Sequence, residues 1–343
     1  MGGFAATPEG GIQLRPKGLY VIPGDFYVDP TRVVDTAVIT HGHGDHARPG
    51  HRRVAATPET LAIMEVRLGR ASKEAAHPLR FGETLKIGDV TVWLAPAGHV
   101  LGSAQVVLEY RGSRVVISGD YKRRRDPTCA GFEPVTCDVF VTEATFGLPI
   151  FRHPDDAGEI RKLLHSLVVF PDRCHVVGAY SLGKAQRMIA LLREAGYDRP
   201  IYLHESLRSL CALYTRFGVA LGDLRPLEPA LGEASAPPLA GEIVLAPPSS
   251  NTDLEGERMS DPLVVGASGW MRVKKHTRQR GAELPLVISD HADWDELFQT
   301  FRDVGAPEIW VTHGREDAIM HQAELEGFKA RALRLVGYGE EET

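Results

Sequence analysis

The stretch Thr40-His41-Gly42-His43-Gly44-Asp45-His46 places four side chains that can bind metal ions within six residues. The apolar run before it, Val33–Ile39, predicts a buried strand, so the histidines follow a strand end. The two glycines have no side chain, and the backbone can therefore turn tightly enough to bring several ligands to one point. Imidazole and carboxylate groups suit zinc, or manganese and iron where oxygen ligands dominate. A solvated histidine-rich turn is the alternative, and the spacing favours the metal site.

The composition is that of an ordinary globular enzyme, because 43% of the 343 residues are hydrophobic and 24% are charged. No apolar run approaches about 18 residues, so we expect no membrane-spanning helix. Residues 1–11 lack the features of an export signal, so we expect a cytoplasmic protein. The four cysteines form no C-x-x-C pair, which predicts reduced thiols. The net charge of −6 gives no global signal for nucleic acid, so any polyanion site must be a local patch.

The pattern of apolar runs changes along the chain. Residues 1–150 have the pattern of short strands separated by tight turns. Helical spacing then alternates with strand-like runs, which predicts a small α/β unit, whereas Leu221–Ala246 is rich in Pro, Ala and Gly and predicts a loop or linker. Buried strands return after it. We therefore predict an α/β fold in which an outer domain, residues 1–150 and 281–343, is interrupted by an inserted domain, residues 151–280.

Three further predicted strands end in a residue that can bind a metal ion. His99, Asp120 and His313 each follow a hydrophobic run, and each lies beside a glycine. Together with the first cluster they give seven ligands, which suits two metal ions. We assign the first ion to His41, His43 and His99. We assign the second ion to Asp45, His46 and His313, and Asp120 bridges the two ions. Two ions about 3.5–4 Å apart can hold a hydroxide between them and stabilise the leaving oxygen of a phosphate ester.

The H-x-H-x-D-H motif and the three later ligands together resemble the metallo-β-lactamase fold, which implies an αββα sandwich. Three further features resemble the nuclease branch of that fold, which carries an inserted α/β β-CASP domain. Glu143 stands where this branch has its motif A, His291 resembles motif B, and His313 resembles motif C. Tyr180–Gln186 resembles the helix start that opens the core of the inserted domain.

Over nearly the whole chain the sequence resembles bacterial ligase-associated DNA exonucleases, through segments such as Pro23–Tyr27, Gly119–Lys122 and Ala267–Met271. That group is named for gene neighbourhoods with an ATP-dependent DNA ligase and a helicase, which implies a role in DNA repair and a functional link to both enzymes. Histidine at motif C is usual in RNA-processing members, so His313 leaves the choice between DNA and RNA open. The resemblance implies two divalent metal ions, with Zn²⁺ favoured and Mn²⁺ as the alternative.

By the same resemblance, His291 is the candidate general acid, and Glu143 is the carboxylate that orients it and keeps it protonated. Asp45 and Asp120 are counted as catalytic with them because they hold the metal ions. Two structural alternatives stay open. Glu143 also fits a turn at a strand end, and His291 also fits the neighbour of a helix N-cap, since Asp293 suits a helix start.

Four residues of the inserted domain are candidates for binding substrate phosphate. Ser181 and Lys184 lie where a strand runs into a helix, so backbone N–H groups there could meet a phosphate. Ser268 and Gly269 are candidates of the same kind, chiefly by resemblance. Capping of the helix by Ser181 is equally consistent with the sequence. Two basic runs, residues 122–125 and 272–280, could contact a nucleic acid, against the alternative that they are solvated charged faces.

These predictions lead to a metal-dependent DNA nuclease, specifically an exonuclease that acts on single strands or frayed ends during repair. An RNA-processing nuclease of the same fold is the second hypothesis. A non-catalytic β-CASP scaffold subunit is the third, and it is disfavoured because such subunits typically lack metal ligands. A small-molecule hydrolase is disfavoured because it would not need the middle domain.

Overall fold

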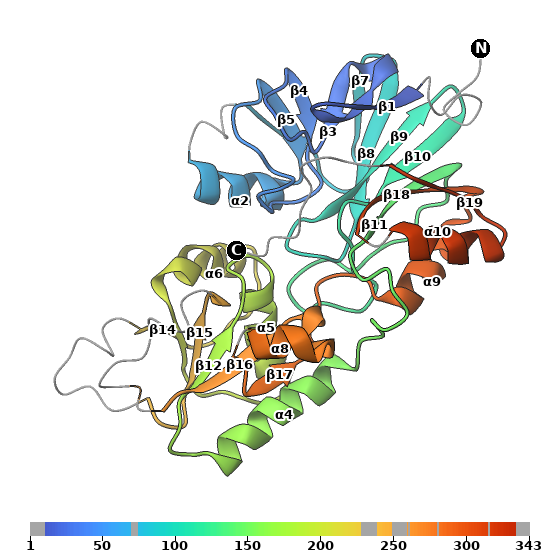
Figure 1. Cartoon of the computed structure of the whole chain (residues 1–343). Coiled ribbons are helices and arrows are strands. Elements are labelled where there is room, and N and C mark those ends of the chain that lie inside the picture. Colours follow the sequence, from blue (N-terminus) through green and yellow to red (C-terminus); the bar gives the residue numbers. More distant parts are fainter. Residues whose placement is uncertain are drawn as a thin grey trace. The chain divides into compact units, whose positions relative to one another are not determined.

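A computed structural model describes residues 11–69, 75–227, 239–248, 259, 261–279, 281–314 and 316–333, without the side chain of His313. The chain divides into two compact units. Unit 1 comprises Met1–Arg152 and His291–Glu342, and unit 2 comprises His153–Asp290. Figure 1 shows both units coloured along the sequence, with unit 2 formed by the middle of the chain. Among the described residues, no helix combines the length and the apolar character needed to cross a membrane.

Unit 1 contains two β-sheets. The first has six strands in the order β1-β2-β3-β4-β5-β6, and the second has seven in the order β19-β18-β11-β10-β9-β8-β7. The strands of the first sheet are β1 (Ile12–Arg15), β2 (Gly18–Val21), β3 (Phe26–Val28), β4 (Thr36–Val38), β5 (Arg53–Ala56) and β6 (Ala76–Pro78). Those of the second are β7 (Thr84–Ile87), β8 (Val90–Pro96), β9 (Ala104–Tyr110), β10 (Ser113–Ile117), β11 (Val139–Ala144), β18 (Glu308–Gly314) and β19 (Lys329–Ala332).

The two sheets pack face to face, because both contribute to one apolar cluster. Phe26 and Val38 of the first sheet lie in this cluster with Val106 and Leu108 of the second. Successive side chains of a strand point to opposite faces, so Val107 belongs to a different cluster on the outer face of the second sheet. Each such fully buried side chain stabilises the fold by roughly 1.5–3 kcal/mol relative to exposure.

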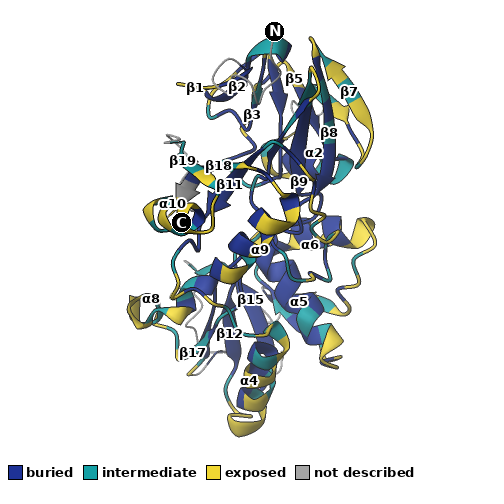
Figure 2. Cartoon of the chain, turned by 90° about the vertical axis from the view of Figure 1, so that its right-hand side faces the viewer, coloured by how far each residue is buried: buried dark blue, intermediate teal, exposed yellow. Residues whose placement is uncertain are grey.

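Helices cover the outer faces of both sheets. Helix α9 (Trp294–Val304) places Leu297 and Phe301 in the outer cluster of the second sheet, and α10 (Glu316–Leu325) adds Ile319. Helix α2 (Pro58–Leu68) packs Met64 against the outer face of the first sheet. Figure 2 shows that α9 buries one side and exposes the other. These layers run helix, sheet, sheet, helix, so the predicted αββα sandwich is confirmed.

Unit 2 is built on one parallel sheet of six strands in the order β14-β13-β15-β12-β16-β17. Its strands are β12 (His175–Gly178), β13 (Ile201–Leu203), β14 (Leu224–Pro226), β15 (Ile243–Ala246), β16 (Leu263–Ala267) and β17 (Leu284–Leu286). Its helices are α4 (Asp156–Val169), α5 (Lys184–Glu194), α6 (Glu205–Arg216) and α8 (Lys274–Gln279), with the 3-10 turn η3 (Gly269–Arg272). Alternating strands and helices of this kind are typical of a parallel sheet.

One prediction about unit 2 was wrong. Leu221–Ala246 contains two strands of the sheet, β14 and β15, and β15 lies between β12 and β13. Residues 228–238, between these strands, lie outside the described part of the chain. The four residues of β15 are all buried, and so short an apolar run inside a Pro- and Gly-rich stretch carries too little periodicity to be recognised as a strand.

Candidate metal centre

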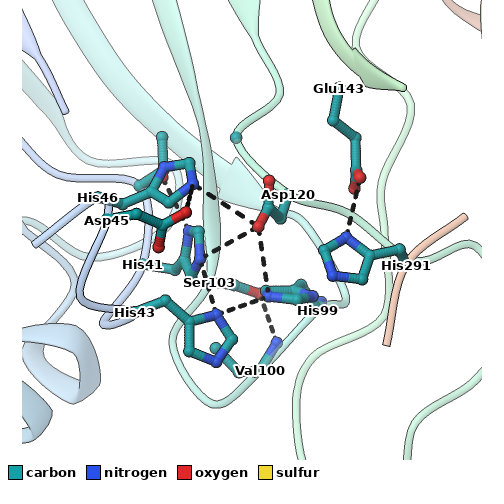
Figure 3. A network of polar contacts seen from close by, with 12 residues as sticks. His41, His43, Asp45, His46, His99, Val100, Ser103, Asp120, Glu143 and His291 are labelled. Atoms are coloured by element: carbon teal, nitrogen blue, oxygen red, sulfur yellow. Dashed lines mark hydrogen bonds and ion pairs between the residues drawn. The ribbon is translucent and has the colours of Figure 1, made fainter. Parts of the chain in front are cut away.

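Four of the predicted ligands meet at one point of unit 1. Ligand atoms of His41, His43, His99 and Asp120 all lie within 4.8 Å of one another. Nδ1 of His43 lies 3.0 Å from Nε2 of His41 and 3.0 Å from Nε2 of His99. Oδ2 of Asp120 lies 3.5 Å from Nε2 of His41 and 3.8 Å from Nε2 of His99. Figure 3 shows the three imidazoles and the carboxylate pointing toward a common centre.

A second group of ligands adjoins the first through Asp120. Nε2 of His46 lies 3.6 Å from Oδ2 of Asp120 and 3.5 Å from Oδ2 of Asp45. Oδ1 of Asp45 is buried and has no hydrogen-bond partner among the described residues. The same Asp120 oxygen therefore lies near histidines of both predicted metal sets, as a bridging carboxylate would.

These separations suit a divalent metal ion. Tetrahedral zinc with Zn–N bonds of about 2.0–2.1 Å sets its ligand atoms about 3.3 Å apart, and four of the separations between ligand atoms in this cluster are 3.0 to 3.8 Å. A neutral imidazole carries only one N–H, so three ring nitrogens at this spacing cannot all be satisfied by hydrogen bonds to one another. The residues present therefore fit a metal ion of the zinc type.

The seventh predicted ligand, His313, belongs to β18, and its side chain lies outside the described residues. Its backbone position is nevertheless informative. Strands β10, β11 and β18 are parallel neighbours, and Ala144 at the end of β11 pairs with Gly314. The carboxyl ends of parallel neighbours meet at one sheet edge, so the residues that follow β10, such as Asp120, leave the sheet at the edge where His313 lies.

A glycine lets Asp120 enter the cluster. Gly119 adopts a left-handed backbone conformation with φ of 55°. A Cβ atom at this position would lie 2.7 Å from the side chain of Thr40, the residue that opens the metal loop. Only glycine combines this backbone angle with so close an approach.

Glu143 and His291 form a hydrogen-bonded pair beside the cluster. Nδ1 of His291 lies 2.8 Å from Oε2 of Glu143, which is almost fully buried. Glu143 also accepts hydrogen bonds from the backbone N–H of Tyr121 at 2.7 Å and from the hydroxyl of Thr145 at 2.5 Å. The ring centroid of His291 lies 4.6 Å from that of His99. The contact with Glu143 therefore fixes the orientation of the His291 ring.

The helix-start alternative for this segment is also correct. Asp293 caps α9, accepting a hydrogen bond from the backbone N–H of Glu296, whose side chain bonds back to the N–H of Asp293. His291 therefore lies just before a capped helix, where a rigid start fixes the backbone that carries its ring.

Sequence reasoning missed Asp29, which holds the loop of residues 40–46 through hydrogen bonds. Its side chain accepts hydrogen bonds from the backbone N–H of Thr40 at 2.8 Å and from the Thr40 hydroxyl at 2.6 Å. It also lies 2.8 Å from Nδ1 of His46, while the Thr40 hydroxyl lies 3.0 Å from Nδ1 of His41. Engaging Nδ1 leaves Nε2 of both histidines directed at the cluster. The available signal was an aspartate directly after a short strand, β3, which neighbours β4 in the sheet.

Comparison with known proteins agrees with this geometry. Residues 29–174 match the metallo-β-lactamase superfamily. The chain therefore contains a metallo-β-lactamase domain. A solved structure of a protein of unknown function from Enterococcus faecalis superposes on this chain with a TM-score of 0.59 and 13% identity, over 88% of this chain and 79% of that one. At this identity the match shows the fold alone.

Three curated relatives are similar in sequence to this chain. A probable DNA ligase of Opitutus terrae is 28% identical over 92% of this chain and 30% of its own length. Cleavage and polyadenylation specificity factor subunit 3-I of Arabidopsis thaliana is 26% identical over 62% of this chain and 36% of its own length. A ribonuclease of Thermus thermophilus is 26% identical over 92% of this chain and 89% of its own length. The chain thus spans about a third of the first two relatives.

The electrostatics of the metallo-β-lactamase site divide its histidines into two kinds. Burial lowers the pKa of His41 well below its ordinary value, and the neighbouring His46 lowers it further. Burial also acts to lower the pKa of His46, but the carboxylates of Asp120, Asp45 and Asp29 more than offset it and raise that pKa to about 10. Without metal, His41 is therefore neutral and ready to bind, whereas His46 carries a proton.

Metal uptake should therefore release the proton of His46. A metal ion needs the neutral imidazole, so at any pH well below 10 one proton leaves this residue as the ion binds. We expect the apparent affinity for Zn²⁺ to rise about tenfold per pH unit between pH 7 and 9. Isothermal titration in two buffers of different ionisation enthalpy measures the released protons. Equal heats in both buffers would contradict the assignment of His46 as a protonated ligand.

Replacing Asp29 with asparagine should weaken metal binding. The variant keeps the shape of the side chain but removes the charge that fixes His46, and such supporting carboxylates typically contribute about 10–100-fold to metal affinity. Asp35→Asn is the matched control, because Asp35 is half exposed and pairs with Arg53. Competition with a chromophoric chelator gives the affinity. Unchanged zinc affinity in Asp29→Asn would show that this contact does not support the ligand.

The four predicted phosphate-binding residues lie in unit 2. Strands β12 and β16 are paired in parallel, so Ser181 after one and Ser268 with Gly269 after the other lie at the same sheet edge. Ser268 caps η3 by accepting a hydrogen bond from Trp270 N–H at 3.3 Å. Lys184 is buried, and its ammonium group bonds to the carbonyl of Ile288 at 2.8 Å and to Asp290 at 2.9 Å. That ammonium group therefore has partners inside unit 2.

The basic run at residues 122–125 was predicted as a candidate patch for binding nucleic acid. In the structure, three of its four residues are either buried or paired with acidic residues of unit 1. Lys122 is almost fully buried. Arg123 forms an ion pair with Asp303, and Arg124 pairs with Asp293 at 2.6 Å and with Glu296 at 2.8 Å. These acidic partners belong to α9 and its cap, far away in sequence, so the run ties the loop after Asp120 to α9.

Proposed function

We propose that this chain is a metal-dependent nuclease of the β-CASP branch that hydrolyses phosphodiester bonds in DNA, as an exonuclease in DNA repair. The observation that carries the proposal is the convergence of three histidines and Asp120 within 4.8 Å, beside the Glu143–His291 pair. On this proposal unit 1 is the metallo-β-lactamase domain, interrupted by unit 2 as the β-CASP domain.

The metal ligands on this proposal fall into the two predicted sets joined by Asp120. Two divalent ions, Zn²⁺ first and Mn²⁺ second, would be held by the first set, His41, His43 and His99, and by the second set, Asp45, His46 and His313. When bound, such ions supply Lewis-acid activation of water and of the phosphodiester. The role of the protein is to hold these side chains in place, which Asp29 and Thr40 support through Nδ1 of His46 and His41.

His291 would protonate the leaving oxygen of the phosphodiester. Its Nδ1 is held by Glu143, and a buried carboxylate fixed by two other donors cannot swing away from the ring. The negative charge of Glu143 favours the protonated imidazole, which is the form an acid needs. After the transfer, the neutral ring regains a proton from solvent, because the side chain is 23% exposed.

The relatives' names support a nucleic acid as the substrate. They differ on whether that nucleic acid is DNA or RNA. A probable DNA ligase matches 92% of this chain over only 30% of its own length, so a segment like this one occurs within a larger protein named for DNA joining. That supports DNA and a functional link to a ligase. The link to a helicase stays a prediction. The relatives named as a ribonuclease and as a cleavage and polyadenylation factor favour an RNA-processing nuclease as the second candidate.

One comparison separates the two candidates. Single-stranded DNA and RNA of one sequence, labelled at the 5′ or the 3′ end, are incubated with the metal-loaded protein. The proposal predicts faster cleavage of DNA, with products that shorten progressively from one end. Faster cleavage of RNA would establish the second candidate instead, and internal cuts would exclude an exonuclease. Phosphate binding by Ser181, Ser268 and Gly269 stays a prediction within this scheme.

A further inference from the structure

A basic segment connects β16 to β17 in unit 2. No Asp or Glu occurs between residues 262 and 282, whereas the same stretch contains five Lys and Arg residues in a chain of net charge −6. The segment forms η3 and α8, which lie between the two strands in sequence. A local excess of positive charge of this size attracts anions even when the chain as a whole carries a net negative charge.

The described cations of this segment have no acidic partner among the described residues. Arg272, Lys274, Lys275 and Arg278 are all exposed, and none forms an ion pair with another described residue. The acids that flank the segment in sequence already have a cationic partner, because Asp261 and Glu283 share Arg173, at 3.1 and 2.9 Å.

The contrast with the other basic run is informative. At residues 123 and 124 each arginine lies against a carboxylate of α9 or its cap, so that charge serves the fold. Within the part of the chain that the structure describes, no carboxylate serves this purpose for the four cations of η3 and α8. Unpaired cations repel one another, and a sequence gains no stability by grouping them, so the grouping calls for an external anion.

An aromatic residue precedes these cations in sequence. Trp270 of η3 is partly exposed, and its ring centroid lies 5.3 Å from that of His276 on α8. Cations interleaved with an aromatic ring are the combination that single-stranded nucleic acids use, because phosphates pair with the cations and bases stack on the ring. A folded acidic protein would not need the ring, and a free phosphate would not span four cations.

We propose that Arg272, Lys274, Lys275 and Arg278 form a track for the sugar-phosphate backbone of a single-stranded nucleic acid. The inference rests on the proposed nuclease function and deepens it by assigning strand binding to unit 2. Each backbone contact on a single strand contributes about 0.7 to the slope of log K against log salt concentration, so four contacts contribute about 3.

The test replaces all four cations with glutamine, as Arg272→Gln, Lys274→Gln, Lys275→Gln and Arg278→Gln in one protein. Binding of a fluorescein-labelled oligothymidylate and of oligouridylate is followed by anisotropy between about 50 and about 200 mM salt, a range over which backbone contacts lose much of their affinity. We expect the slope to fall by about 3 and the affinity at the lowest salt to fall at least about tenfold. Loss on both polymers indicates backbone contact, and loss on one alone would overturn a backbone track.

The matched control removes four other exposed cations that have no ion pair with a described residue, as Lys86→Gln, Arg208→Gln, Arg216→Gln and Lys329→Gln. It changes the net charge equally and should leave slope and affinity near those of the unsubstituted protein. A third protein, with Arg272→Lys, Lys274→Arg, Lys275→Arg and Arg278→Lys, keeps every charge and should keep the slope. An unchanged slope in the glutamine variant, or an equal loss in the control, would overturn the inference.

The outcome is separable from that of the proposed function. Hydrolysis of bis(p-nitrophenyl) phosphate by the unsubstituted, metal-loaded protein reports phosphodiesterase chemistry without strand binding. If this substrate is cleaved and the four substitutions leave strand binding intact, the track alone is wrong. If no diester is cleaved, the proposed function fails, while the anisotropy result still decides whether the segment binds a strand.

Discussion

Replacing Asp120 with alanine should lower kcat for DNA cleavage at least about 10³-fold and reduce the metal content of the protein. One oxygen of Asp120 lies 3.5 to 3.8 Å from ring nitrogens of His41, His46 and His99, so it is the single side chain that both predicted metal sets share. Charge stabilisation by metal ions amounts to several kcal/mol, and about 1.4 kcal/mol corresponds to a factor of ten in rate.

Single-turnover cleavage and elemental analysis on the same preparation test this prediction. Asp126→Ala is the matched control, because Asp126 is also a buried aspartate, and its side chain accepts the backbone N–H of Thr128 at 2.8 Å. The control should keep its metal and its activity. An Asp120→Ala protein that retained more than about a tenth of the kcat would rule out Asp120 as the bridging ligand.

Replacing His291 with alanine should lower kcat by about 10²–10⁴-fold while leaving the metal content unchanged. The ring is held by Glu143 rather than by the histidine cluster, so its loss removes a proton donor and not a primary ligand. The acid must be protonated to act. In the unsubstituted protein kcat should therefore fall as the pH rises and His291 loses its proton, and this alkaline decline should be absent in the variant.

The pH profile and the metal content together decide between the roles of His291. His321→Ala is the control, because His321 is an exposed histidine of α10 in the same unit. Survival of activity in His291→Ala would exclude the acid role. Loss of metal along with activity would make His291 a ligand, which the second grouping of Asp120, Glu143 and His291 within 4.8 Å also permits.

The sequence could predict that these histidine and aspartate side chains come together, because they follow buried strands. Hydrophobic runs identify the strands, and parallel neighbours such as β10, β11 and β18 necessarily end at one edge, so polar residues after them converge. The αββα layers could be predicted only through the resemblance, since periodicity does not tell which strands share a sheet.

Long-range partners were the features that the sequence could not show. Arg123 pairs with Asp303, 180 residues away, and Lys184 bonds to Ile288, 104 residues away. The residues near either cation in sequence do not show whether it pairs with a group of the same chain or faces solvent and a ligand. Asp29 was missed for the same reason. Its contact with His46 exists only because β3 pairs with β4, which brings Asp29 next to the loop that carries His46.

The central claim is that the histidine and aspartate cluster of unit 1 binds metal ions that enable phosphodiester cleavage. Titrating the metal-free protein with Zn²⁺ or Mn²⁺, while following cleavage of a labelled single-stranded DNA, tests it most directly. The account predicts that activity rises with the metal bound and reaches a plateau at about two equivalents per chain. Metal binding to the same stoichiometry without cleavage of any DNA or RNA diester would contradict it.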